Sequence, residues 1–162
     1  MLGEMKPMKY LKELILINMK VSGGDISLFL RYCPLLRRLT VRASILTSDV
    51  HVCGATLVLE YLQLHYCDLT ESVINISAPN LSEVKIDANP GQLWFNDVPR
   101  LVEAKFMHHF ACEVSCITSQ LQKLTISLSY SESFLTNSFP QMPNLKESTI
   151  RNSSLYKHGY QK

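Results

Sequence analysis

The sequence Leu59-Glu60-Tyr61-Leu62-Gln63-Leu64-His65-Tyr66-Cys67-Asp68-Leu69 carries apolar residues in the order L-x-x-L-x-L-x-x-C-x-L. Leu62 and Leu64 are two residues apart, which is the period at which strand side chains return to one face. The stretch therefore predicts a short β-strand with one buried face. It also predicts a turn at Cys67, where a small polar side chain can bond to backbone that has left the strand.

The first six positions of this stretch recur along the whole chain. Seven copies begin at Leu11, Leu36, Leu59, Leu81, Leu101, Leu121 and Leu145, so that successive copies are 25, 23, 22, 20, 20 and 24 residues apart. Of the 21 template positions in the seven copies, 20 are apolar, and the exception is Ser148. Spacings of 20–29 residues with this pattern are typical of leucine-rich repeats. We expect residues 1–162 to form a single leucine-rich-repeat domain with a frayed polar tail at residues 152–162.

The repeat predicts an α/β solenoid in which one strand per coil joins a parallel concave sheet of about seven short strands. The convex path changes along the chain. Residues 25–33 predict one N-terminal helix, because Ile26, Phe29, Leu30 and Cys33 follow helical spacing between Gly23-Gly24 and Pro34. Later coils predict short convex strands or irregular coil, with alternating apolar pairs at Val50 and Val52, Ile74 and Ile76, and Leu93 and Phe95. The serine-rich residues 127–138 predict a loop.

Composition excludes several classes of protein. The net charge of +2 argues against a dedicated nucleic-acid binder, and no apolar run is long enough to predict a membrane span. The 46% of hydrophobic residues predicts a folded core. Five cysteines without a recognisable secretory signal favour buried thiols in a reducing compartment, which is cytoplasmic or nuclear.

Several blocks resemble plant F-box/leucine-rich-repeat proteins of the F-box/LRR/FBD type over roughly residues 8–150. The blocks are residues 30–39 (LRYCPLLRRL), residues 59–67 (LEYLQLHYC), residues 76–81 (ISAPNL) and residues 96–103 (NDVPRLVE). The resemblance implies a protein-binding scaffold that holds a target protein for a ubiquitin ligase. In such proteins an F-box docks on a Skp-type adaptor. No residues before Met8 could form an F-box, so a Skp-type partner is expected only for a longer form. The alternative is a stand-alone or immune-type leucine-rich-repeat binding domain with no ubiquitin-ligase link.

Repeat proteins usually bind partners with the concave side chains that point away from the core. Tyrosine and arginine from the second and third copies would cluster there, and these residue types are favoured at binding hot spots. Our hypothesis is that a protein partner, of unknown identity, contacts Arg38, Arg42, Tyr61, Gln63, His65, Tyr66, Lys85 and Asp87. The alternative is an ordinary solvated sheet face whose charges pair across strands.

Other kinds of site receive weaker support. His108, His109, Cys112 and Cys116 are potential zinc ligands, but their spacing lacks the paired arrangement of structural zinc sites, so we expect no metal and no cofactor. No phosphate-binding loop or serine nucleophile elbow occurs in the sequence. We therefore expect no catalytic residues and no enzymatic activity.

Overall fold

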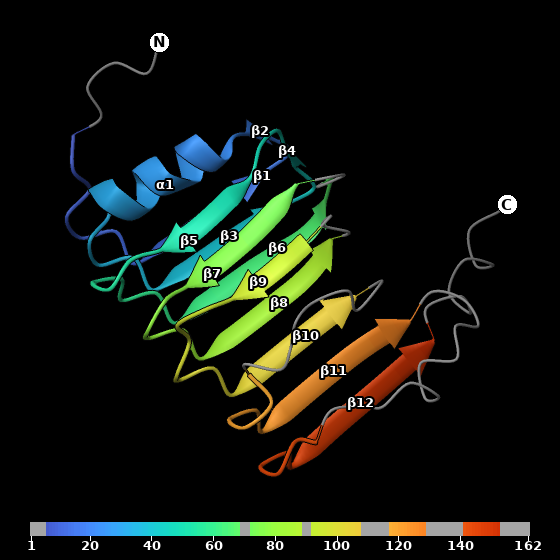
Figure 1. The fold of residues 1–162 in the computed structure, drawn as a ribbon. Coiled ribbons are helices and arrows are strands. Elements are labelled where there is room, and N and C mark those ends of the chain that lie inside the picture. Colours follow the sequence, from blue (N-terminus) through green and yellow to red (C-terminus); the bar gives the residue numbers. More distant parts are fainter. Residues whose placement is uncertain (1–5, 69–71, 89–91, 108–116, 129–140, 153–162) are drawn as a thin grey trace, which may run out of the picture.

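Seven parallel strands form the main sheet of the computed structural model (Figure 1), which describes residues 6–68, 72–88, 92–107, 117–128 and 141–152. In spatial order the strands are β1 (Glu13–Ile17), β3 (Arg38–Arg42), β6 (Tyr61–Cys67), β8 (Glu83–Ala88), β10 (Glu103–Met107), β11 (Lys123–Leu128) and β12 (Glu147–Asn152). Each strand begins two residues after the first leucine of its repeat copy. The predicted solenoid with one strand per coil is therefore confirmed.

The register of the sheet aligns equivalent repeat positions side by side. Glu13 lies opposite Arg38, Arg38 opposite Tyr61, and Tyr61 opposite Glu83. The row continues through Glu103, Lys123 and Glu147. The predicted starts of the serine-rich loop and of the C-terminal tail are each wrong by one or two residues. Ser127 and Leu128 belong to β11 instead of a loop, and Asn152, assigned to the tail, pairs with Leu128 as the last residue of β12. The rest of the predicted loop and tail lies outside the described residues.

Burial of the apolar template positions is most complete in coils that have a neighbour on both sides. At the sixth position, Leu64 is 1% exposed and Ile86 is 2% exposed, whereas Ile150 in the last strand is 50% exposed. At the fourth position of the first coil, Leu14 is only partly buried. The same side-chain type is thus buried or exposed according to its neighbours, as expected where each coil contacts only the adjacent ones.

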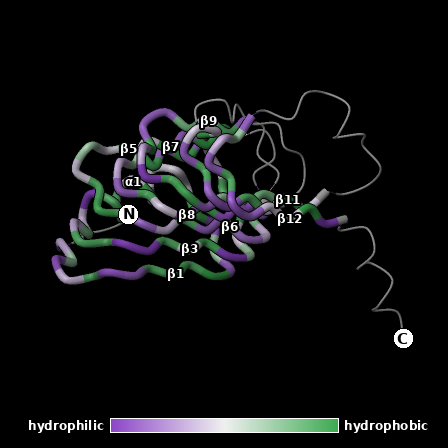
Figure 2. The backbone as a smooth tube through the Cα atoms, turned by 90° about the horizontal axis from the view of Figure 1, so that it is seen from below, coloured by the Kyte–Doolittle hydropathy of each residue, from purple (hydrophilic) through white to green (hydrophobic). Residues whose placement is uncertain are grey.

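A second layer lies behind the main sheet (Figure 2) and contains α1 (Gly23–Tyr32), β5 (Val50–Cys53), β7 (Val73–Ser77) and β9 (Gln92–Phe95). The three strands form a parallel sheet in the order β5-β7-β9, so the three alternating apolar pieces are confirmed as strands. A smaller parallel pair, β2 (Lys20–Val21) with β4 (Ile45–Leu46), was not predicted. Strands of two residues are too short to show a period of two.

The helix begins two residues earlier than predicted, at Gly23, and ends at Tyr32. Ser22 is its N-cap: the Ser22 hydroxyl accepts from the Asp25 N–H at 3.1 Å, and the Asp25 carboxylate accepts from the Ser22 N–H at 2.8 Å. This reciprocal capping box satisfies backbone donors that lack helical partners. The hydrogen bonds from Ser22 lower the pKa of Asp25.

The chain leaves the first three strands through one repeated backbone conformation. Asn18, Ala43 and Tyr66 occupy equivalent positions and have φ angles of 54°, 47° and 51°. At the next position of the second copy, the Ser44 hydroxyl donates to the Arg42 carbonyl at 2.7 Å, and in the third copy the Cys67 thiol lies 3.7 Å from the His65 carbonyl oxygen. An unbroken repeat register would place Tyr66 opposite Ala88, but the register shifts and Cys67 lies opposite Ala88 instead. Tyr66 is the extra residue of a bulge.

Replacing Leu62 with alanine should lower the free energy of unfolding by about 2–5 kcal/mol, because Leu62 is fully buried between two coils. Ile15 is 50% exposed on the same sheet, so Ile15→Ala is the control and should cost less than about 1 kcal/mol. Urea unfolding followed by circular dichroism measures both. Equal losses for the two variants would contradict the stacked core.

Replacing Ala43 with glycine should raise the free energy of unfolding by about 1 kcal/mol, because a side chain at positive φ is strained and glycine is not. Ala55 is exposed in a turn and does not have a positive φ. Ala55→Gly should therefore slightly lower the free energy of unfolding, because glycine raises the conformational entropy of the unfolded chain. Thermal and urea unfolding of both variants should show shifts of opposite sign.

Candidate functional site

The eight residues of the predicted binding surface come from three adjacent strands of the main sheet. Arg38 and Arg42 lie on β3, Tyr61 to Tyr66 on β6, and Lys85 and Asp87 on β8. For all of them except Tyr66, the template positions alternate with the buried ones, so the side chains emerge on the sheet face turned away from the second layer. The bulge turns Tyr66 to the same face, where its ring packs against His65. We call this side of the sheet the open face. The structure thus brings together all eight residues, seven of them through the strand register and Tyr66 through the bulge beside His65.

Tyr61 is held between two cations and is not a free contact residue. The guanidinium carbon of Arg38 lies 4.0 Å from the centroid of the Tyr61 ring, and the Lys85 ammonium lies 5.1 Å from it. The Tyr61 hydroxyl also donates to Gln63 Oε1 at 2.8 Å. Only 6% of Tyr61 is exposed, so the expectation that its ring is available to a partner needs correction. Its ring instead positions the charged groups around it.

Acidic neighbours neutralise part of the charge around Tyr61. Glu83 Oε1 lies 2.5 Å from Lys85 Nζ, and Glu13 Oε1 lies 3.4 Å from Arg38 Nε. Partial burial by itself would lower the pKa of Lys85, but the hydrogen bond and charge of Glu83 outweigh it, and the pKa is raised. For Arg38 and Lys85, the alternative interpretation of self-paired sheet charges is therefore well supported.

His65 and Asp87 form a second pair on the open face. His65 Nδ1 lies 2.8 Å from Asp87 Oδ2, and Asp87 is only 5% exposed. The Tyr66 ring packs against His65, with ring centroids 4.1 Å apart. Because Asp87 is buried and holds the imidazole, the orientation of His65 is defined, and His65 in turn supports Tyr66.

The residues available to a partner are Arg42 and Tyr66. Tyr66 is 68% exposed, and Arg42 is exposed and lies beside His65 in the register. Arg42 forms no ion pair with any other residue that the structure describes. Sequence reasoning missed Lys105, which lines a depression of about 80 Å³ together with Gln63, His65, Lys85 and Asp87. Lys105 lies opposite Lys85 in the register, and that shared row was the signal that could have identified it.

The described cysteines do not have the lowered pKa of a nucleophile. Burial raises the pKa of the thiols of Cys33, Cys53 and Cys67, the opposite of what an activated nucleophile needs. No group of three or more potential ligands is placed to hold a metal within the described ranges. The zinc alternative at residues 108–116 lies outside them. No helix in the described part of the chain is long and apolar enough to cross a membrane.

Comparison with known families extends over nearly the whole chain. The family model described as "At1g61320/AtMIF1, LRR domain" matches residues 2–160. That description names a leucine-rich-repeat domain and does not mention an F-box. No curated protein and no solved structure matches the chain.

Because Tyr61 is buried between Arg38 and Lys85, we expect its side chain to stabilise the fold. Tyr61→Ala should lower the free energy of unfolding by about 2–4 kcal/mol, and Tyr61→Phe, which removes one hydrogen bond, by about 1 kcal/mol. Tyr66→Ala is the matched control and should change it by less than about 1 kcal/mol, because Tyr66 is exposed. A Tyr61→Ala variant as stable as the parent protein would disprove this role.

Proposed function

The chain belongs to the leucine-rich-repeat domain family described as At1g61320/AtMIF1, and from that premise we propose that its open face at β3, β6 and β8 binds a protein partner. Solenoids of this kind are interaction scaffolds, in which side chains displayed on a regular sheet provide an extended contact surface. The partner would contact the outward residues of the second to fourth coils.

One observation carries the proposal: Tyr66 and Arg42 are exposed beside a surface whose other side chains are already held in place. The Arg38–Tyr61–Lys85 stack and the His65–Asp87 pair order that surface in the free protein. A partner that binds here would not have to order those groups, so less conformational entropy is lost on association. Exposed tyrosine and arginine next to a rigid surface are characteristic of binding hot spots.

We further propose that the bound partner is a target protein of an F-box-type ubiquitin ligase. The support is the resemblance of residues 30–39, 59–67, 76–81 and 96–103 to plant F-box/leucine-rich-repeat proteins. A Skp-type adaptor would join only through an F-box in a longer form of the protein. The second candidate is a stand-alone or immune-type binding domain, which would use the same open face without any link to ubiquitin.

The binding experiment begins with affinity purification of the tagged chain from its own tissue, followed by measurement of the dissociation constant for each recombinant candidate. The double variant Arg42→Ala, Tyr66→Ala should weaken the affinity for the true partner by about tenfold or more, because loss of hot-spot residues has effects of this size. Trp94→Ala is the matched control, because Trp94 is an exposed aromatic residue on β9 in the second layer. Loss of binding with Trp94→Ala but not with the double variant would overturn the proposed surface.

The ubiquitin-ligase link requires a separate test. Sequencing the transcript on both sides of these codons, and purifying the product at its natural length, should reveal an F-box and an associated Skp-type adaptor. If the full-length natural protein has no F-box and binds its partner without such an adaptor, the stand-alone domain would be favoured.

A further inference from the structure

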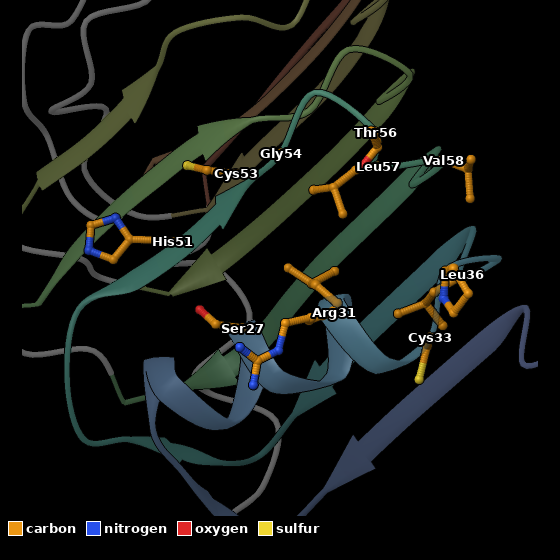
Figure 3. A pocket seen from close by; sticks show the side chains of 12 residues that line it. Ser27, Arg31, Cys33, Leu36, His51, Cys53, Gly54, Thr56, Leu57 and Val58 are labelled. Atoms are coloured by element: carbon orange, nitrogen blue, oxygen red, sulfur yellow. The ribbon is translucent and has the colours of Figure 1, made fainter. Parts of the chain in front are cut away.

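A cleft of about 480 Å³ opens in the second layer, between α1 and β5 (Figure 3), on the side of the molecule away from the open face. One wall is α1 and the turn that follows it. The other wall is β5 and residues 54–58. Its volume falls within the range of about 300–1,000 Å³ that is usual for small-molecule sites.

The cleft exists because the second layer changes from a helix to strands at this point. β7 pairs with both β5 and β9, whereas α1 is wider than a strand and does not join this sheet. The start of α1 is packed tightly: the Gly23 N–H donates to the Ser48 hydroxyl at 2.9 Å, and a Cβ on Gly23 would lie 1.7 Å from the Asp49 carbonyl oxygen. The cleft lies along the later part of the helix, beyond this tight contact.

β5 turns an unpaired backbone edge toward the cleft. The Gly54 N–H donates to the Ser77 carbonyl at 3.0 Å, and the only strand that pairs with β5 in the described sheet is β7. Backbone groups alternate in direction along a strand, so those of His51 and Cys53 point to the other side, toward α1. The cleft wall therefore offers backbone N–H donors as well as side chains.

The lining of the cleft is polar at one end and apolar at the other. Figure 3 shows Ser27, Arg31 and His51 toward one end, with Leu57, Val58 and Leu36 toward the other. Ser27 and Arg31 are four residues apart and share one helix face. None of the lining residues is acidic.

Arg31 is available to a ligand at the polar end. Its side chain is exposed, and its guanidinium carbon lies 5.2 Å from the Tyr32 ring centroid. It forms no ion pair with the residues that the structure describes. A planar guanidinium of this kind can hold a carboxylate with two parallel hydrogen bonds.

We propose that this cleft binds a small organic anion, with a carboxylate at the Arg31 end and an apolar body over Leu57. Arg31 and the backbone N–H groups of β5 would hold the carboxylate. The apolar body would cover surface that is otherwise in contact with water. This site is separate from the open face, so the protein-binding proposal and this one stand or fall independently.

The test uses 3-phenylpropionate as the probe and 3-phenylpropanamide as its neutral counterpart, with the whole chain labelled for amide NMR. We expect 3-phenylpropionate to shift amide signals of α1 and β5 with a dissociation constant on the order of 1 mM, as suits so small a ligand. Arg31→Gln should weaken the binding of 3-phenylpropionate about tenfold and leave the affinity for 3-phenylpropanamide unchanged. Arg100→Gln, at a second exposed arginine, is the control and should have no effect.

Three results would overturn the proposal. Equal affinity for the acid and the amide would exclude an anion site. Shifts confined to β3, β6 and β8 would exclude the cleft as the location. An acetylated tripeptide ending in phenylalanine that binds more than about tenfold tighter than the probe would assign the cleft to a polypeptide carboxylate instead of a free small molecule. Because Arg31 is exposed, Arg31→Gln should keep the circular dichroism spectrum and melting temperature of the parent chain.

Discussion

Lateral stacking of equivalent apolar side chains is the interaction on which this structure depends. No single coil buries its own leucines, since Leu64 and Ile86 are covered by coils on both sides while Ile150 in the last strand stays half exposed. The free energy of burial is therefore gained between coils. This requirement brings every strand into the same register, because a slip of one residue would turn the leucines outward.

The same register arranges the open face, whose residues take no part in the stacking of the leucines. Side chains at one repeat position form a row across the sheet, and the sequence places acids and bases as neighbours in those rows. Glu13 meets Arg38, and Lys123 lies 3.7 Å from Glu103 and 3.6 Å from Glu147. These pairs are exposed enough that each adds little stability. Arg42 and Tyr66 are left exposed next to these paired and ordered side chains.

The second layer is where the coils differ from one another. Its path is helical in the first coil and extended in the coils of β5, β7 and β9. A regular solenoid would pack its second layer without gaps, so the change of element is what creates the cleft beside α1. The two proposed sites follow from opposite properties of the repeat: the open face from its regularity, and the cleft from its interruption.

Residue periodicity alone determined the solenoid, the seven strands and their register up to the bulge at Tyr66, because burying a leucine at each repeat leaves only one alignment of the coils. It also located α1 and the three strands of the second layer, whose apolar residues follow the helical and strand periods. Only the tertiary structure decided what the outward residues do. Tyr61 and Tyr66 look alike in sequence, yet one is covered by Arg38 and Lys85 and the other is displaced outward by a bulge. The reason is that outward side chains follow no burial period, so their exposure depends on neighbours that lie about 20 residues away in the chain and next to them in space.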